Sequence, residues 1–172
     1  MSTTATVVAS LRSLLGAEAV LTEPPDLERY EKGWRYGQGR ARAVVRPAST
    51  EEVARVLAFA AAQRLRVLPQ GANTGLVGGS TPDASGEMLV LSLERLARQL
   101  EIDAVDRTVT AEGGVLLSQL DAALAEQGLM FPIDLGADPT VGGMVATNAG
   151  GTRLLRYGDL RQNLLGLEAV LA

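Results

Sequence analysis

The chain has 172 residues, of which 47% are hydrophobic, 21% are charged and 3% are aromatic, and its formal net charge is −4. Such a chain can bury a core, built here mainly of Ala, Val and Leu, as one domain or as two small lobes. It contains no His and no Cys. Disulfides, cysteine-based zinc sites, haem ligation by either residue, Ser-His-Asp triads and cysteine nucleophiles are therefore excluded within it.

The basic residues are dispersed along the chain. Of the 16 Lys and Arg residues only Lys32 is a lysine, and no Gly-x-x-x-x-Gly-Lys segment is present, so a P-loop is excluded. The negative net charge, with basic residues dispersed, argues against a nucleic acid as the partner. The N-terminal stretch lacks the basic region of a signal peptide, and no run of residues suits a membrane helix. We therefore expect a cytoplasmic protein without a membrane span.

Residues 1–39 are expected to form a helical extension that precedes the domain proper. Apolar residues at helical spacing from Val7 to Leu15 predict one helix that ends at Gly16. A second, short helix is expected over Asp26–Glu31, with Asp26 as its cap. Three aromatic side chains in this extension are interpreted as packing or partner contacts without a role in chemistry: Tyr30, Trp34 and Tyr36.

Residues 40–172 are expected to form two lobes of an α+β domain, the first ending near residue 95. Ser49 and Glu52 have the spacing of a capping box and predict a helix between two parallel strands, which is a βαβ unit. A long glycine-rich loop and a third strand follow. The expected elements of this small lobe are, in chain order, Ala43–Val45, the helix to Arg64, Val67–Leu68, the loop Pro69–Gly86 and Met88–Leu91.

The second lobe, about residues 96–172, is expected to be rich in strands. Its final stretch, Leu167–Leu171, has the pattern of a strand with nothing after it to pair with, which predicts that the chain is a truncated piece. The preceding elements are expected to be strands over Leu100–Ala104 and Thr108–Ala111 with a turn at Asp106-Arg107, a helix that Ser118 caps and Gly128 ends, and an irregular stretch over Pro132–Asn148.

The first segment that could bind a ligand runs from Pro69 to Ser80 and follows an expected strand. Its glycines let backbone N–H groups point into one concavity, because no Cβ blocks close approach. Asn73, Thr74 and Ser80 add neutral donors, so the loop suits a pyrophosphate held without positive side chains. The glycine spacing is not that of the Rossmann fingerprint. The alternative is a flexible surface loop.

The second segment, Asp138–Gly151, is rich in Gly and small polar residues and carries a single charge. Small residues allow a flat cofactor to lie against the backbone, whereas the alternative is a tight buried turn. Two nearly uncharged glycine-rich segments favour one ligand held between two lobes. Nearby, Asp134 is expected to cap a turn or to accept N–H bonds, and Tyr157 to stack on a ring or to pack.

These two segments resemble the two FAD-binding loops of the vanillyl-alcohol oxidase/PCMH superfamily. The first match runs from Pro69 to Gly79, and the second runs from Gly142 to Gly151 and continues in Arg156-Tyr157-Gly158. Within the superfamily the chain is most similar to the D-2-hydroxy-acid dehydrogenase branch. That branch includes D-2-hydroxyglutarate and D-lactate dehydrogenases and the glycolate oxidase D subunit. The similarity covers residues 40–172.

The resemblance implies a PCMH-type FAD domain of two lobes, incomplete at its C-terminus. FAD would be bound non-covalently, because the chain has no His or Cys to link it. The first loop would surround the pyrophosphate, and the second would line the ribityl and flavin part. The implied cofactor-binding residues are Pro69, Gly71, Ala72, Asn73, Thr74, Gly75, Leu76, Gly78, Gly79, Ser80, Pro132, Asp134, Gly136, Gly142, Gly143, Thr147, Asn148, Gly150, Gly151, Tyr157 and Gly158. Met144 departs from the branch, which often has Asn there.

The implied activity is oxidation of a D-2-hydroxy acid by hydride transfer to FAD. In the family, the small-molecule substrate, the catalytic groups and the metal-binding histidines belong to a C-terminal domain beyond these residues. No catalytic residue and no metal ligand is therefore assigned here, and the electron acceptor is left open. Two alternatives remain: a flavin oxidase of another alcohol or sugar, and a non-catalytic truncated remnant that binds nucleotide weakly.

Overall fold

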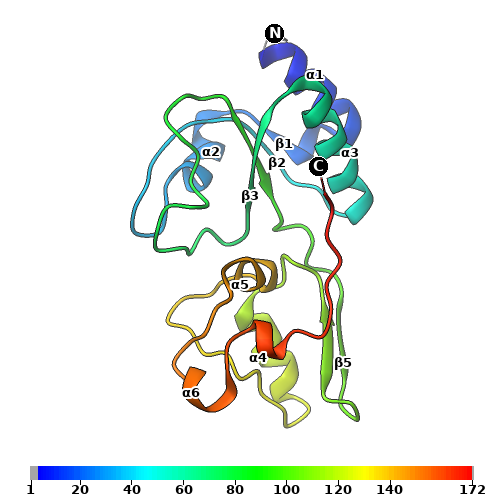
Figure 1. Ribbon diagram of the computed structural model, residues 1–172. Coiled ribbons are helices and arrows are strands. Elements are labelled where there is room, and N and C mark those ends of the chain that lie inside the picture. The colour runs from blue at the N-terminus through cyan, green and yellow to red at the C-terminus, as the bar shows by residue number, and fades with distance from the viewer. Residues whose placement is uncertain (1–3, 172) are drawn as a thin grey trace. The chain divides into compact units, whose positions relative to one another are not determined.

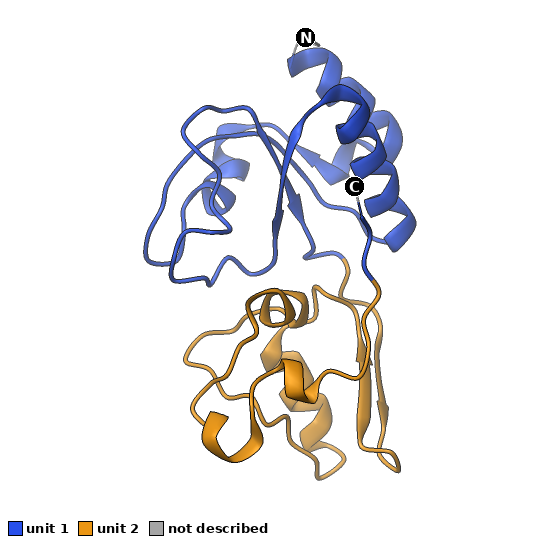
Figure 2. Ribbon diagram, in the orientation of Figure 1, with its two compact units in different colours: residues 1–95, 169–172 blue, residues 96–168 orange. Residues whose placement is uncertain are grey.

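The computed structural model describes residues 4–171 and divides the chain into two compact units. Unit 1 comprises residues 1–95 and 169–172, and unit 2 comprises residues 96–168 (Figures 1 and 2). Each unit has its own buried cluster of apolar side chains. No helix among the described residues is long and apolar enough to cross a membrane.

Unit 1 is built on a four-stranded sheet in the order β1-β2-β4-β3. Its strands are β1 (Val20–Leu21), β2 (Ala41–Val45), β3 (Arg66–Gln70) and β4 (Met88–Ser92). Strands β2 and β3 each pair with β4 in parallel, and β1 pairs with β2 antiparallel. The expected parallel strands therefore exist, but they are not neighbours, because β4 lies between them. Its residues Leu89–Leu91 are almost fully buried, as the central strand of a covered parallel sheet requires.

Helix α3 (Thr50–Gln63) connects β2 to β3 and begins as predicted. The Ser49 hydroxyl accepts the Glu52 N–H at 3.2 Å, while the Glu52 carboxylate accepts the N–H of Ala48 rather than that of Ser49. Helix α2 (Pro24–Glu31) begins earlier than expected, because Pro24 has the backbone geometry of a first helical position. Glu23 is therefore the N-cap, and Asp26, the predicted cap, lies inside the first turn.

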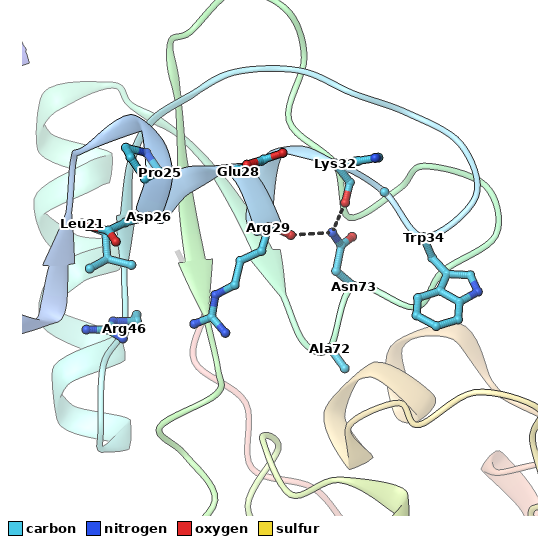
Figure 3. Close-up of a pocket in the computed structure, with 11 residues that line it drawn as sticks. Leu21, Pro25, Asp26, Glu28, Arg29, Lys32, Trp34, Arg46, Ala72 and Asn73 are labelled. Atoms are coloured by element: carbon cyan, nitrogen blue, oxygen red, sulfur yellow. Dashed lines mark hydrogen bonds between the residues drawn. The ribbon is translucent and has the colours of Figure 1, made fainter.

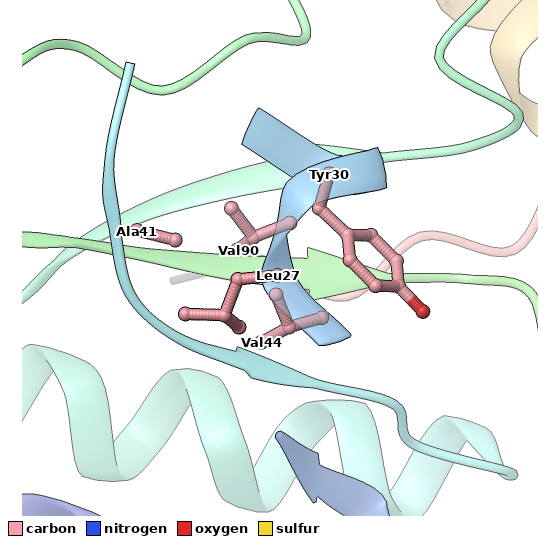
Figure 4. Packing of buried hydrophobic residues seen from close by; sticks show 5 residues of the cluster. All are labelled: Leu27, Tyr30, Ala41, Val44 and Val90. Carbon is pink, nitrogen blue, oxygen red and sulfur yellow. The ribbon is translucent and has the colours of Figure 1, made fainter. Parts of the chain in front are cut away.

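The residues before Arg40 contribute to the core of unit 1. Helix α1 (Thr4–Leu15) buries Val7 and Leu11 almost completely and ends before Gly16, and a short 3-10 turn, η1 (Ala17–Ala19), leads into β1. Helix α2 packs two side chains onto the sheet. The resulting cluster consists of Leu27, Tyr30, Ala41, Val44 and Val90 (Figure 4).

Unit 2 contains the predicted hairpin of β5 (Leu100–Asp103) and β6 (Thr108–Ala111). The rest of the unit is helical or irregular rather than rich in strands, with α4 (Leu117–Ala125), α5 (Val141–Thr147), α6 (Leu154–Tyr157) and the 3-10 turn η2 (Arg161–Asn163). Ser118 is not the cap of α4, because it already lies in the helix. The Asp138 carboxylate instead accepts the N–H and the hydroxyl of Ser118 at 2.9 and 2.7 Å.

The prediction of a strand over Leu167–Leu171 is wrong. Residues 164–171 form neither helix nor strand, and Leu165, Leu167 and Leu171 are 85%, 65% and 87% exposed. A strand exists only when its backbone groups pair with a neighbour. Among the described residues no segment pairs with this one, so the apolar sequence alone does not make it a strand.

Candidate functional site

The loop that follows β3 presents an uninterrupted row of free backbone donors. Among the described residues, none of the N–H groups from Ala72 to Ser80 donates to another group of the protein. Positive φ angles at Asn73 (56°) and Gly78 (71°) turn the chain there. Above Gly79 there is no atom within 4 Å of where a Cβ would lie, so the backbone is open to a ligand. Consecutive free N–H groups in such turns form anion-binding concavities.

Two hydrogen bonds from one buried side-chain amide hold the start of this loop. Gln70 is 2% exposed, and its side-chain nitrogen donates to the carbonyl of Tyr30 at 3.0 Å and to that of Ser80 at 2.6 Å. The first carbonyl belongs to α2 and the second to the far end of the loop. A buried amide that loses such partners leaves unpaired polar groups, so Gln70 fixes the loop against α2.

Asn73 makes a second attachment, and this changes the role expected of its side chain. The amide nitrogen of Asn73 donates to the carbonyl of Lys32 at 2.8 Å and approaches that of Arg29 at 3.4 Å. Its amide oxygen accepts the Ser80 hydroxyl at 2.7 Å. The expectation that Asn73 and Ser80 offer side-chain donors to a ligand stays a prediction, and in this structure those donors have partners within the protein. Both side chains are already bonded within the protein and shape the loop.

An open cavity of about 800 Å³ lies beside the loop within unit 1 (Figure 3). Ala72 and Asn73 form one side of it, and α2 with the residues after it forms another. Figure 3 shows the Asn73 amide directed to the carbonyls of Arg29 and Lys32, so the loop and the end of α2 are joined at the cavity. Its lining residues are Leu21, Pro25, Asp26, Glu28, Arg29, Lys32, Gly33, Trp34, Arg46, Ala72 and Asn73.

An ion-pair network forms part of the cavity wall. Glu94 binds Arg29 at 2.8 Å and Arg46 at 3.2 Å, and the Tyr30 hydroxyl lies 3.0 Å from both Glu94 oxygens. Arg29 also donates to the Tyr30 oxygen. Burial of the ring and the nearby Glu94 charge raise the pKa of Tyr30, so its hydroxyl stays protonated and donates to Glu94. Both arginines share the single Glu94 carboxylate, so the network keeps a net positive charge.

In unit 2 the glycines of the second segment serve packing. Gly142 lies in α5, and a Cβ there would approach the Gly113 carbonyl oxygen to 2.8 Å, the same oxygen that accepts the Gly142 N–H. Thr140 caps α5 by accepting the N–H of Gly143 at 3.1 Å. The prediction that residues 132–148 are irregular is therefore wrong over α5, because a capped and tightly packed turn of helix tolerates its two glycines.

Asp134 and Gly151 form a second packed contact. Gly151 has φ of 72°, and a Cβ there would lie 2.4 Å from the backbone oxygen of Asp134. The Asp134 carboxylate accepts the Thr152 hydroxyl at 2.8 Å and lies 3.9 Å from Arg153. Asp134 thus binds a hydroxyl and an arginine of its own unit, rather than capping a turn through N–H groups as expected.

The end of α5 is fixed by Asn148 and Asp159. Asn148 has φ of 51°, donates to the Asp159 carboxylate at 2.9 Å and accepts the N–H of Arg161 at 2.9 Å. The hydrogen bond from Asn148, followed by that from the Gln162 N–H, lowers the pKa of Asp159. Tyr157 is half-buried beside a cavity of about 310 Å³, with the Arg156 guanidinium 5.1 Å from its ring centre.

The residues proposed to bind the cofactor thus fall into two groups, those from Pro69 to Ser80 in unit 1 and those from Pro132 to Gly158 in unit 2. Within the second group, Gly151 packs against the backbone of Asp134. Lys32 and Trp34 also line the cavity beside the loop, a position that their spacing in the sequence does not predict. Among residues 4–171 no cluster of acidic residues could hold a metal ion.

The family model described as an FAD binding domain matches residues 41–172. This match covers most of the chain and includes both glycine-rich segments. The chain therefore belongs to the FAD binding domain family, which confirms the family inferred from the two loops.

Similar proteins cover nearly all of this chain, but the chain covers only part of them. It is 45% identical over 166 residues to a D-2-hydroxyglutarate dehydrogenase of Xanthomonas citri pv. viticola, covering 95% of this chain and 35% of that protein. It is 40% identical over 171 residues to a putative mitochondrial D-lactate dehydrogenase of Schizosaccharomyces pombe, covering 93% of this chain and 32% of the other. The chain thus spans about a third of the length of these relatives.

Solved structures confirm the PCMH-type fold. An alkyldihydroxyacetonephosphate synthase superposes with a TM-score of 0.80 at 21% identity, covering 93% of this chain and 32% of the synthase. A p-cresol methylhydroxylase with bound substrate superposes with a TM-score of 0.67 at 24% identity, covering 86% of this chain and 29% of that enzyme.

The expected cytoplasmic location is contradicted by these comparisons. Relatives from Schizosaccharomyces pombe, Bos taurus and Arabidopsis thaliana are named as mitochondrial, and relatives also occur in bacteria. Composition and a mildly apolar N-terminal stretch do not carry this information, because a domain keeps the same fold in either compartment.

Proposed function

We propose that this chain is the FAD-binding part of a flavin-dependent oxidoreductase that oxidises a D-2-hydroxy acid. The observation that carries the proposal is the similarity along nearly the whole chain to a protein named D-2-hydroxyglutarate dehydrogenase. The similar D-lactate dehydrogenases have substrates of the same chemical class. D-2-hydroxyglutarate, D-lactate and glycolate are therefore the substrates to test.

The loop of unit 1 fits the diphosphate of FAD. Its N–H groups from Ala72 to Ser80 have no acceptor among the described residues, and a Cβ on Gly79 would meet no atom within 4 Å. The bonds of Gln70 and Asn73 hold this arrangement before a ligand arrives, which lowers the entropic cost of binding. The backbone around α5 in unit 2 would contact the ribityl and flavin part, as the family resemblance implies.

FAD supplies hydride acceptance at its flavin ring when it is bound. The residues of this chain bind and orient the cofactor, and none of them is proposed to move the substrate's proton. We also propose non-covalent attachment, because the side chains that link flavin in some superfamily members, His and Cys, do not occur in this chain.

The test uses the natural polypeptide that contains these 172 residues. We expect it to be purified with a flavin absorption spectrum that D-2-hydroxy acids bleach and their L-enantiomers do not. Dye reduction with D-2-hydroxyglutarate, D-lactate and glycolate then orders the substrates. Acid precipitation should leave the yellow colour in the supernatant. Bleaching by sugars alone, or a protein that neither contains nor binds FAD, would contradict the proposal.

A further inference from the structure

We infer that Glu94 is a positioning residue for the loop between Ala72 and Ser80. Its carboxylate holds the last turn of α2 through Arg29 and Tyr30, and the main chain of that turn holds the loop. Glu94 does not line the cavity beside the loop, so it acts on the loop through α2. Where the inference concerns the affinity for FAD, it rests on the proposed function.

The carboxylate of Glu94 joins three segments of unit 1. Arg29 donates to its two oxygens at 3.0 and 2.8 Å, and the Tyr30 hydroxyl lies 3.0 Å from each of them. Arg46, which follows β2, donates to it at 3.2 Å. Glu94 itself lies just after β4, the central strand of the sheet, so these bonds tie α2 to that strand. Among residues 4–171 no other carboxylate pairs with either arginine.

The backbone carbonyls at the same end of α2 hold the loop. The carbonyl of Tyr30 accepts the Gln70 amide at 3.0 Å, and that of Lys32, the C-cap of α2, accepts the Asn73 amide at 2.8 Å. In Figure 3 the Arg29 carbonyl is joined to Asn73, whereas the Arg29 guanidinium extends away from that bond. A displacement of this helical turn therefore also displaces the acceptors that hold the loop.

The ion pairs of Glu94 are partly sheltered from water. The Glu94 side chain is 29% exposed and that of Arg46 is 24% exposed, so salt and water screen their attraction less than at an open surface. Without the carboxylate, Arg29 and Arg46 lose their shared counter-charge, and the Tyr30 hydroxyl loses an acceptor. We therefore expect the end of α2, and with it the loop, to be held less firmly when Glu94 is removed.

The direction of the change in FAD affinity distinguishes positioning from a simple charge effect. The diphosphate of FAD is negative, so the loss of a negative carboxylate from unit 1 would by itself tighten FAD binding. The loss of the loop's fixed position would weaken FAD binding, because the loop must then be ordered when the cofactor binds. Our inference predicts weaker binding.

The first measurement tests the loop without a ligand. Thermolysin cleaves before apolar residues, and Leu76 and Val77 in the loop are 56% and 89% exposed. In the natural polypeptide that contains these residues, Glu94→Ala should be cleaved there about fivefold faster than the wild type. The control is Glu87→Ala, because Glu87 also pairs with an arginine, Arg66, at 3.2 Å, but lies just before β4. The control should change the rate less than about twofold.

The second measurement is the Kd of the flavin-free polypeptide for FAD. Glu94→Ala should raise this Kd about five- to tenfold, and Glu87→Ala should leave it unchanged. Glu94→Gln should raise it only about twofold, because the amide oxygen still accepts hydrogen bonds from Arg29 and Tyr30 although the charge is lost. Circular dichroism confirms that each variant is folded.

Kinetics at saturating FAD distinguish positioning from a general loss of structure. With the best of the three D-2-hydroxy acids, kcat and KM should change less than about twofold in Glu94→Ala, because Glu94 acts on the loop and not on the substrate. A general loss of structure would lower kcat even when FAD is saturating.

A double variant tests the route through α2. Asn73→Gly removes the bonds from the loop to the carbonyls of Arg29 and Lys32. In that background Glu94→Ala should add about twofold or less to the cleavage rate and to the Kd, because the main connection between α2 and the loop is already broken.

The outcomes separate this inference from the proposed function. Tighter FAD binding in Glu94→Ala, equal changes in Glu94→Ala and Glu87→Ala, or an undiminished effect in the Asn73→Gly background overturns the inference and leaves the proposed function standing. If the wild-type polypeptide binds no FAD, the proposed function is contradicted. The cleavage rates then decide the inference alone: faster cleavage in Glu94→Ala supports it, and an unchanged rate overturns it.

Discussion

The two glycine-rich segments have similar compositions, but their glycines differ in what surrounds them. In the loop of unit 1, a Cβ on Gly79 would meet no atom within 4 Å, and one on Gly75 would meet only the Ser80 hydroxyl, at 3.7 Å. In unit 2, a Cβ on Gly142 or Gly151 would collide with a backbone carbonyl oxygen at 2.8 or 2.4 Å. The glycines of the unit 1 loop leave backbone N–H groups open to a ligand, whereas those of unit 2 allow two backbone segments to come into contact.

This difference shows that glycine content by itself does not identify a ligand loop. A glycine can be required because a ligand must approach the backbone there, or because another segment of the chain already packs against that backbone. The two cases predict different losses upon substitution: affinity in the first and stability in the second. The experiments below test this division, beginning with the largest expected effect.

Gly151→Ala should destabilise unit 2 by about 3 kcal/mol, since it combines strain at positive φ with a collision against backbone. The Cβ would lie 2.4 Å from the Asp134 oxygen, which no side-chain rotation can relieve. Urea unfolding followed by circular dichroism measures the loss. The control is Gly136→Ala, where a Cβ meets nothing within 4 Å and should change stability by less than about 0.5 kcal/mol. Equal urea midpoints for the Gly151→Ala and Gly136→Ala variants would show that Gly151 has no packing role.

Gln70→Leu should cost about 2 kcal/mol, because it leaves two carbonyl groups without their buried donor. Those carbonyls belong to Tyr30 and Ser80, so the loop should also be released from α2. We expect faster proteolysis between Gly71 and Ser80 in addition to a lower urea midpoint. Gln99→Leu is the control, since Gln99 is exposed. Unchanged proteolysis in Gln70→Leu would show that the loop is held by other contacts.

Gly75→Val should lower the affinity for FAD at least tenfold, about 1.4 kcal/mol, while stability changes by less than about 0.5 kcal/mol. The Cβ would meet only the Ser80 hydroxyl oxygen, at 3.7 Å, and the valine methyl groups would cover backbone donors of the loop. Flavin content and an FAD titration measure the effect. Gly166→Val places the same side chain at another open glycine, outside the proposed site. If Gly75→Val binds FAD normally, the loop is only a connector.

The smallest expected effect is a difference in the pH dependence of stability between the contacts of Asn73 and Asn148, the two asparagines with positive φ. Asn148 donates to a carboxylate whose pKa is lowered, whereas Asn73 donates to neutral carbonyls. A carboxyl group whose pKa is lower in the folded than in the unfolded state stabilises the folded protein at pH values above its ordinary pKa of about 4. This stabilisation is lost as the pH falls through the folded-state pKa. Asp159→Ala should therefore lower the urea midpoint slightly at neutral pH and leave it unchanged in acid. Asn73→Gly should lower it equally at both pH values.

Short-range sequence signals predicted the local structure well. Ser49 begins α3, and the turn at Asp106-Arg107 joins β5 to β6, because each depends on contacts within a few residues. The two wrong caps have different causes, one local and one distant. Pro24 initiates α2 before Asp26 is reached. The donor groups of Ser118 are bound by Asp138, which is far away in sequence and could not be identified from spacing.

Features that depend on distant partners were not predictable. Helix α5 exists although two glycines weaken it, because Thr140 caps it and Gly142 fits against Gly113. The family resemblance located the loop from Pro69 to Ser80, but only the structure showed that Asn73 bonds to α2. Lys32 and Trp34 are brought to the loop by that bond, so no spacing rule could place them there.

The strand order of unit 1 has a consequence for biosynthesis. Strand β4 is the centre of the sheet but the last of its four strands to be translated. Until Met88–Ser92 leaves the ribosome, β2 and β3 have no shared neighbour, and the apolar faces of the earlier segments cannot be fully covered. Nascent chains arrested before β4 should therefore remain protease-sensitive and bind chaperones. A slightly longer chain should become protected in one cooperative step.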